Sequence, residues 1–272
     1  MKIHFLVPVL LALLLQACAG PRWQHEKLAP GLVWRHTHTT RLYNSRQSIQ
    51  LLKIDPGKRT LSLAFATDTF LPTSRFAQDS HALAAVNAGF FKIKEGRGSA
   101  TYLRVRGRTV DDLPAQGHPR LNGALTLSGD GKQAGIGYAQ PNAVYNADTS
   151  GKTVLVTGPV LLLDGQVQRL DSTSEFIARR HPRTCACVRG DRRVLLVAVD
   201  GRHDEAAGMS LFELTGLMRR LHCRSAVNLD GGGSTTLWIS GKPDNGVVNY
   251  PSDNNRFDHF GERPVGNALL VH

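Results

Sequence analysis

The chain has 272 residues, of which 41% are hydrophobic and 20% are charged, a composition that is ordinary for a globular protein. It excludes a disordered tail, a collagen-like fibre and a polytopic membrane protein, and the length allows one large domain whose core needs no disulfides. Lysine and arginine outnumber aspartate and glutamate by 33 to 22, and 24 of the 33 are arginine, so an anionic substrate or surface is the first partner to consider, with a merely solvated basic surface as the alternative.

The N-terminal residues have the pattern of an export signal. Residues 5–15 form an unbroken apolar run, which is too short to span a bilayer because a span takes about 20 residues. The sequence Leu-Gln-Ala-Cys at 15–18 resembles the bacterial lipobox, which predicts removal of residues 1–17 and lipidation of Cys18; ordinary cleavage after Ala19 is the alternative. Both outcomes place the mature protein in the cell envelope, facing the periplasm, and argue against nucleic acid as its partner.

The polar residues 18–44 predict an irregular tether that leads into one domain spanning residues 45–272. At the start of that domain, apolar and polar residues alternate over 48–55 and again over 60–67. A Pro-Gly pair separates the two segments, and this pattern predicts a β-hairpin.

A short helix is predicted over residues 73–80, capped by Thr73 or Ser74. The apolar residues 82–86 predict a buried strand. The glycine-rich stretch 92–147 contains short alternating segments, which are typical of an antiparallel meander.

The second half of the chain is more regular. Strands are predicted over residues 153–156 and 160–163, and the apolar run 194–199 predicts a buried strand. The Ser-x-x-Glu sequence at 210–213 has the form of a capping box, so a helix should begin at Leu211.

A further strand at residues 226–229 would complete a βαβ unit with the strand 194–199. The predicted fold is therefore mixed α/β, with a mixed sheet, this βαβ unit in the C-terminal half and antiparallel meander insertions. A right-handed crossover would bring Asp200 and Asp230 together at the carboxyl ends of parallel strands, the edge at which such sheets bind ligands.

Three consecutive glycines follow Asp230. Glycines at the end of a buried strand indicate unusual backbone angles or the close approach of another group. Successive N–H groups in such a turn form an anion-binding concavity. A plain tight turn is the alternative, and the spacing matches neither a dinucleotide fingerprint nor a P-loop.

Three cysteines follow the predicted lipidation site. In an oxidising compartment, one disulfide is expected among Cys185, Cys187 and Cys223, with one thiol left over. Cys223 would bridge to Cys185 or Cys187 if that cysteine lies on the neighbouring strand. A zinc site is less favoured, because Cys-x-Cys with one distant cysteine lacks the usual ligand spacing.

Taken together, seven motifs resemble the phosphodiester glycosidase family over roughly residues 45–271. In chain order they are VNAGFF (86–91), GPVLLLDG (158–165), HPRT (181–184), VDGR (199–202), NLDGGGSTT (228–236), YPSD (250–253) and ERPVGNALLV (262–271). The resemblance implies a mixed α/β fold and hydrolysis of a sugar 1-phosphodiester of the N-acetylglucosamine-1-phosphodiester type. The chain departs from the family at Cys-Ala-Cys (185–187), where small aliphatic residues and glycine are usual, and residues 94–152 match no family segment.

Hydrolysis at the sugar carbon expels a phosphate monoester, which is already a good leaving group. The site therefore needs cations and N–H donors on the phosphate, and a carboxylate that acts as base or nucleophile. Asp230 is the first candidate for the carboxylate, Asp200 the second and Glu262 the third.

The remaining candidates would bind substrate. Arg183 and Arg202 suit the phosphate because a guanidinium binds it in a bidentate manner. The backbone of Gly232, Gly233 and Ser234 would add N–H donors, and Asn87 would bind a sugar hydroxyl.

Alternatives to this interpretation stay open. The same residues would suit a non-catalytic envelope module that binds anionic polysaccharide, or a phosphodiesterase that cuts the P–O bond. No cofactor is expected, although Asp200, Asp230 and Asp253 together would suit Ca²⁺. The sequence predicts no oligomeric state.

Overall fold

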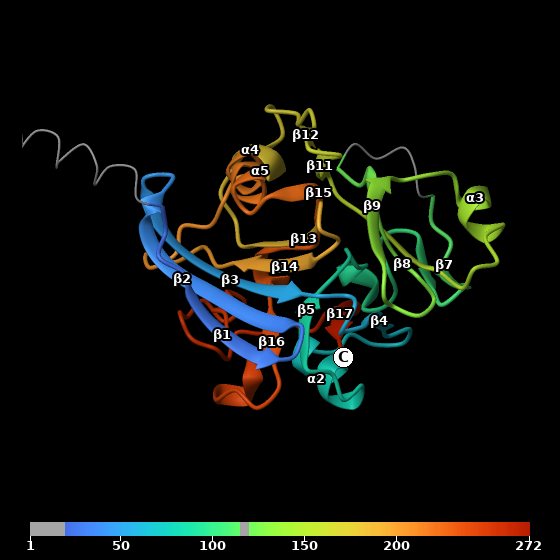
Figure 1. Ribbon diagram of the computed structural model, residues 1–272, viewed down its shortest axis with the longest axis horizontal. Coiled ribbons are helices and arrows are strands. Elements are labelled where there is room, and N and C mark those ends of the chain that lie inside the picture. The colour runs from blue at the N-terminus through green and yellow to red at the C-terminus, as the bar shows by residue number, and fades with distance from the viewer. Residues whose placement is uncertain (1–19, 115–119) are drawn as a thin grey trace, which may run out of the picture.

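The structure is a computed structural model that describes residues 20–114 and 120–272. Three β-sheets make up most of it (Figure 1). The predicted signal (1–17) and Cys18 lie outside the described residues. Within the described part, every helix is too short or too polar to cross a bilayer.

The largest sheet has eight strands, and each strand is antiparallel to its neighbours. Across the sheet they are β1 (Gln24–Ala29), β2 (Leu32–Leu42), β3 (Ser45–Ile54), β14 (Val194–Val199), β13 (Arg183–Arg189), β15 (Cys223–Asn228), β11 (Val160–Leu163) and β12 (Gln166–Val167). The predicted irregular tether is wrong, because most of it forms β1 and β2. These strands look polar in sequence because they lie at the edge of the sheet, where many of their side chains face solvent.

The predicted βαβ unit is not formed by neighbouring parallel strands. Helix α5 (Leu211–Arg220) does connect β14 to β15, but β13 lies between these two strands and pairs antiparallel with both. We predicted no strand at 183–189. Because β14 and β15 are each antiparallel to β13, they run in the same direction and their carboxyl ends lie at the same edge of the sheet. Helix α5 begins where the capping box predicts, with reciprocal hydrogen bonds between Ser210 and Glu213.

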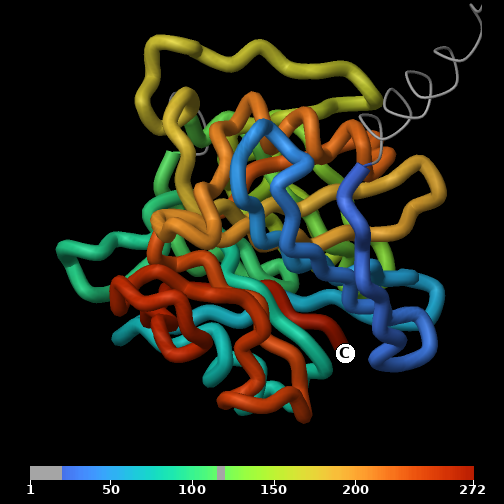
Figure 2. Tube along the Cα trace, turned by 90° about the vertical axis from the view of Figure 1, so that its left-hand side faces the viewer, coloured from blue at the N-terminus to red at the C-terminus, as the bar shows by residue number. Residues whose placement is uncertain are grey.

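A second sheet has four strands, and three of them overlap or adjoin the motifs VNAGFF, NLDGGGSTT and ERPVGNALLV. In order, the four strands are β16 (Leu237–Ile239), β5 (Ala84–Asn87), β17 (Asn267–Val271) and β4 (Leu61–Phe65), and helix α2 (Thr73–Asp79) packs on this sheet. The predicted hairpin is wrong: β3 belongs to the eight-stranded sheet, whereas β4 pairs with β17 (Figure 2). The Pro-Gly pair marks a turn but does not determine which strand β4 joins.

The glycine-rich stretch forms most of a third sheet, as the predicted meander implies. Its five strands are β7 (Arg108–Asp111), β6 (Leu103–Val105), β10 (Thr153–Thr157), β8 (Gly123–Leu127) and β9 (Ala134–Tyr138), and helix α3 (Asn142–Asn146) follows β9. All its pairs are antiparallel. It lies to one side of the other two sheets in Figure 1.

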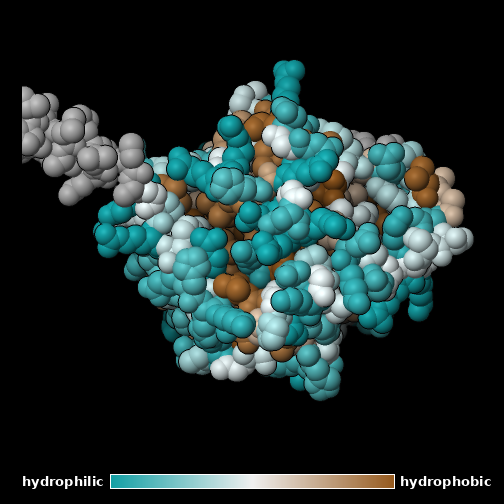
Figure 3. All heavy atoms as spheres, in the orientation of Figure 1, coloured by the Kyte–Doolittle hydropathy of each residue, from teal (hydrophilic) through white to brown (hydrophobic). Residues whose placement is uncertain are grey.

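Both faces of the eight-stranded sheet are buried at its centre. On β14, Leu195 and Val197 belong to a core shared with α5, whereas Leu196 and Ala198 belong to a core shared with the other two sheets. This explains why 194–199 is continuously apolar in sequence. Hydrophilic residues cover most of the face seen in Figure 3.

The predicted disulfide is present between Cys187 and Cys223 and joins β13 to β15. Cys185 is the free thiol that was expected, and it is buried. The bridge therefore connects the strand that begins with the HPRT motif to the strand that leads into Asp230.

Candidate active site

The family motifs lie far apart in the chain but meet at one edge of the central sheet. The amide of Asp230 donates to the carbonyl of Ala88 at 2.8 Å, and the amide of Gly232 donates to the carbonyl of Pro182 at 2.9 Å. These bonds tie the segments after β5 and β15 to the segment before β13. The loop Asp230 to Ser234 is thereby held between two other motifs.

Asp230 is the half-buried carboxylate of this loop. Loss of solvent raises its pKa to about 6, although the Ser234 hydroxyl, the Gly231 amide and the positive charge of Arg263 each oppose that rise. The Gly231 amide donates to Asp230 Oδ1 at 2.9 Å. A carboxylate with this pKa exchanges protons near neutral pH, which suits a general base or acid.

Arg202 lies directly against the glycine loop, so the predicted approach of these two motifs is present. A Cβ on Gly232 would be 2.9 Å from Arg202 Nη2, and Gly232 itself has φ +62°. The backbone angle favours glycine here, and the contact brings the end of the Arg202 side chain onto the loop. Arg202 also has a positive φ, of 67°, a left-handed turn conformation that several other non-glycine residues of the chain share.

Arg183 has a different role from the predicted one. Its side chain is 1% exposed, and it donates to the carbonyls of Met209 (2.9 Å), Phe176 (2.6 Å) and Arg179 (3.0 Å). Burial, and to a smaller extent the charge of Arg202, lowers its pKa to about 10. The prediction that Arg183 binds phosphate is not supported, because its donors hold three main-chain carbonyls, in the segments 176–179 and 209, in place around the start of β13.

Asp200 is likewise buried by its partners and is not an open carboxylate. It is completely buried and accepts hydrogen bonds from Ser48 Oγ (2.6 Å), Asn249 Nδ2 (3.0 Å) and the Tyr250 amide (2.8 Å). Burial raises its pKa, and these donors partly offset the effect. The prediction of a second catalytic carboxylate is not supported, because Asp200 instead anchors the YPSD motif to the end of β14.

Asn87 also positions other residues instead of facing substrate. Its side chain is completely buried; Oδ1 accepts from Thr184 Oγ1 (2.7 Å) and the Thr236 amide (3.1 Å), and Nδ2 donates to the Asp230 carbonyl (2.7 Å). All of these contacts lie inside the protein, so the predicted bond to a sugar hydroxyl is wrong. The residue fixes the main chain of Asp230.

Glu262 caps α2. Its carboxylate accepts from the amide (2.7 Å) and the hydroxyl (2.6 Å) of Ser74, in the first turn of that helix. Burial raises the pKa of this carboxyl. The sequence suggested that Thr73 or Ser74 would cap α2 with its own side chain, but the cap comes from a residue 188 positions away. Glu262 is therefore structural, and it drops out as a third catalytic carboxylate.

The glycine loop uses most of its amides internally. Besides the Gly232 amide, which is bonded to Pro182, the Ser234 amide donates to the Gly231 carbonyl at 3.2 Å. Of the three predicted N–H donors, those of Gly232 and Ser234 are therefore occupied, and the donor role of the Gly233 amide stays a prediction. The positive charge at this loop comes from side chains.

Arg263 lies against this loop, and we did not predict it as a site residue. It forms an ion pair with Asp253, and a Cβ on Gly233 would be 2.5 Å from Arg263 Nη2 and 2.6 Å from Asp253 Oδ1. The signal that was available is its place directly after Glu262 in a family motif. We assigned that motif to the carboxylate and overlooked the guanidinium.

The three aspartates suggested for Ca²⁺ do not form a cation site. Asp200 is held by three donors and Asp253 by Arg263. Within residues 20–114 and 120–272, no three histidine, cysteine, aspartate or glutamate side chains are grouped closely enough to hold a metal ion.

Comparisons with known proteins agree with this geometry. A family model described as phosphodiester glycosidase matches residues 80–272, which is well over half of the chain. Human N-acetylglucosamine-1-phosphodiester alpha-N-acetylglucosaminidase is 25% identical over 249 residues, and the mouse enzyme is 32% identical over 108 residues. These alignments cover 86% and 39% of this chain, but only 45% and 20% of the relatives, so the chain spans less than half of their length.

A solved structure shares the fold. The catalytic domain of zebrafish N-acetylglucosamine-1-phosphodiester alpha-N-acetylglucosaminidase superposes with a TM-score of 0.71 and 19% identity, and the match covers 93% of this chain and 88% of that domain. A hypothetical protein from Synechocystis superposes with a TM-score of 0.69 and 16% identity, and the match covers 93% of this chain and 64% of that one.

Proposed function

This chain belongs to the phosphodiester glycosidase family, and from that premise we propose that it hydrolyses a sugar 1-phosphodiester of the N-acetylglucosamine-1-phosphodiester type to free sugar and a phosphate monoester. The observation that carries the proposal is that Asp230, with its pKa of about 6, belongs to a glycine loop against which the exposed Arg202 packs at Gly232. A carboxylate and a cation, the two groups that the reaction requires, would thereby act at one loop.

The reaction would divide between these two side chains. Arg202 would bind the phosphate and stabilise the charge that develops on it as the bond to the sugar carbon breaks. Asp230 would either deprotonate the water that attacks that carbon or attack the carbon itself as a nucleophile; the transition state carries positive charge there. Arg183, Asp200 and Asn87 would hold the surrounding main chain.

The proposal is tested with residues 20–272, a N-acetylglucosamine 1-phosphodiester and a measurement of released sugar. Asp230→Asn should lower kcat at least about 100-fold, because a positioned base contributes at least that much. Asp68→Asn is the matched control, since Asp68 is exposed and its carboxylate accepts a hydrogen bond from its neighbour Thr67. Full release by Asp230→Asn would remove this residue from the mechanism.

The products separate this reaction from the two alternatives. In ¹⁸O-water, hydrolysis at the sugar carbon labels the sugar, whereas cleavage of the P–O bond labels the phosphate. A binding module would retain the substrate without any release, and its affinity would fall with Arg202→Ala but not with Asp230→Asn.

We also propose that the protein is exported, anchored by lipid at Cys18 to a membrane facing the periplasm, and acts on envelope glycans. The apolar run and the lipobox-like sequence support this. Mass spectrometry of the mature protein should find an acylated N-terminal peptide beginning at Cys18. A mature N-terminus after Ala19 would contradict the anchor while leaving export intact.

A further inference from the structure

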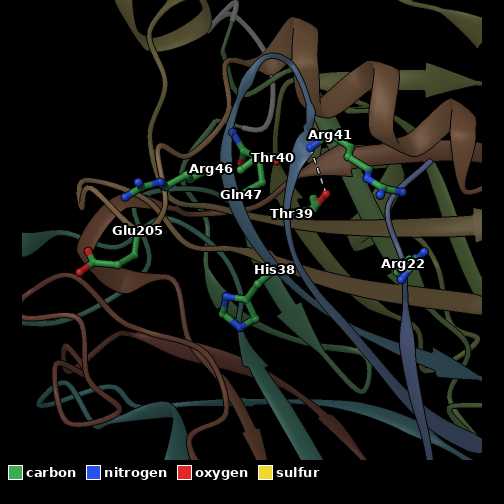
Figure 4. Close-up of a pocket in the computed structure, with 8 residues that line it drawn as sticks. All are labelled: Arg22, His38, Thr39, Thr40, Arg41, Arg46, Gln47 and Glu205. Atoms are coloured by element: carbon green, nitrogen blue, oxygen red, sulfur yellow. Dashed lines mark hydrogen bonds between the residues drawn. The ribbon is translucent and has the colours of Figure 1, made fainter. Parts of the chain in front are cut away.

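A cavity of about 480 Å³ lies beside the tip of the β2–β3 hairpin (Figure 4). Most of its charge comes from arginine, and the side chains that matter here are Arg22, Arg41, Arg46, His38, Gln47 and Glu205. We refer to it as the arginine cavity. A volume of this size is sufficient for a small ligand or one unit of a polymer.

The arginines of this cavity lack acidic partners. No ion pair involves Arg22, Arg41 or Arg46 within the part of the chain that the structure describes, and Glu205 is the one acidic residue in the lining. Cations held around one hollow repel each other, and an anionic ligand relieves that repulsion. The lining therefore favours a negatively charged occupant.

Gln47 provides a second, independent observation. Its side chain is 1% exposed; Nε2 donates to Ser45 Oγ and to the Gly208 carbonyl, each at 2.8 Å, while Oε1 has no hydrogen-bond partner. A buried acceptor without a partner is costly, by about 1–3 kcal/mol. This unsatisfied acceptor lies directly beneath the lining of the arginine cavity, out of contact with solvent.

The arginine cavity is separated from the candidate active site by one loop, residues 200–209. Gln47 binds Gly208 in that loop, and Gly208 packs against His181, directly before the Pro182 that holds the glycine loop. The same loop carries both Arg202 of the active site and Glu205 of the cavity. The two sites therefore adjoin the same loop, and an extended ligand is the kind that would occupy both.

The lining continues on the other side of His38. This residue also lines a second cavity, of about 310 Å³, whose wall includes Trp34 and Tyr250. The rings of His38 and Tyr250 are in edge contact, with centroids 5.7 Å apart. Aromatic walls with a few polar groups are typical of small-molecule sites. The arginine cavity would bind an anionic group, the second cavity would bind a sugar ring, and the two are joined at His38.

We propose that the arginine cavity is a subsite for an anionic group on an extended glycan, beyond the phosphodiester that is cleaved. The inference rests on the proposed function and narrows its substrate to an oligosaccharide or polymer with at least two negative groups. Phosphate and carboxylate share the required chemistry, and the test includes both.

Binding tests this without turnover. The measurement is isothermal titration in an Asp230→Asn background, with two ligands. One is a four-unit phosphodiester-linked N-acetylglucosamine oligomer, and the other is a four-unit uronate oligosaccharide. The double change Arg41→Gln with Arg46→Gln should weaken the binding of one or both at least 10-fold. The matched control is Arg192→Gln with Arg219→Gln, two exposed arginines that form no ion pair within the described residues. If the two double variants bind both oligosaccharides with equal affinity, the inference is overturned. Binding to anionic lipid vesicles is measured alongside, and a loss of vesicle binding with unchanged oligosaccharide binding would also overturn it.

Kinetics separates failure of the subsite from failure of the proposed function. On a substrate with a single phosphodiester, Arg41→Gln with Arg46→Gln should keep KM within about twofold, whereas KM for the oligomer should rise at least 10-fold. If no variant releases sugar but the oligomer still binds through the arginine pair, the proposed function is wrong and the subsite stands. An unchanged KM for the oligomer in an active enzyme would sink the subsite alone.

Discussion

At the scale of single residues, Asp230 is unusual because its surroundings disfavour the charge that the reaction needs. Loss of solvent raises its pKa to about 6, and nearby donors and Arg263 recover part of that cost. An ordinary aspartate titrates near 3.9, so the folded protein binds this proton more tightly than the unfolded chain does. The ionised form therefore destabilises the fold.

This gives a prediction for stability against pH. Below about pH 4 the carboxyl is protonated in both states, and as the pH rises from 4 to 6 only the unfolded state loses the proton, so this residue's contribution to stability falls. Asp230→Asn should thus increase the free energy of unfolding at pH 7.5 by about 3 kcal/mol and leave it nearly unchanged at pH 3.5. Urea unfolding at both pH values checks this, with Asp68→Asn as the control; an equal effect at both pH values would contradict it.

The sequence predicted which residues meet, but it predicted their roles less well. Asp230 and Arg202 were selected from motifs and do meet at the glycine loop. Asn87 was predicted to bind substrate and Glu262 to be a catalytic carboxylate, because their side chains suit those roles. Instead they bond to Asp230 and Ser74 across 143 and 188 positions of the chain. A single sequence does not show which polar side chain will find such distant partners.

At the scale of elements, local signals were reliable and pairings were not. Helix α5 and strand β14 were predicted within a residue or two, because a capping box and a run of apolar residues are local. The strand β13 was missed between them, and β4 was paired with the wrong strand. Pairing depends on side chains contributed by other parts of the chain, which local alternation does not encode.

The disulfide between β13 and β15 leads to a prediction at this scale. The bridge joins residues that are 36 positions apart, and it restricts the unfolded chain. Its removal should lower the free energy of the unfolded state by about 4 kcal/mol, because that state gains conformational entropy. Cys187→Ser with Cys223→Ser should lower the free energy of unfolding by about that amount, measured by urea unfolding. Cys185→Ala, which removes the buried free thiol, is the matched control and should cost much less.

At the scale of the whole molecule, the central sheet extends further towards the N-terminus than its sequence suggests. The tether was predicted from polarity, but β2 pairs with β3 along most of its length. An edge hairpin with one solvated face has no continuous apolar run, so composition alone does not distinguish it from a linker.

Truncation tests this extension. A chain of residues 20–272 should fold, whereas a chain of residues 45–272 should aggregate, because removal of β1 and β2 leaves the apolar strand β3 as an open sheet edge. Soluble yield and thermal unfolding followed by circular dichroism are the measurements. A cooperative unfolding transition in the shorter chain would contradict this and would support a domain that begins at residue 45.

Strand β17, residues 267–271, lies in the interior of its sheet, between β5 and β4. During vectorial emergence from a ribosome or a translocation pore, β4 and β5 appear some 180 residues before the strand that joins them. Neither can complete its ladder until then, so this sheet can close only when synthesis is nearly finished. Late commitment of this kind is compatible with passage through a membrane as an unfolded thread.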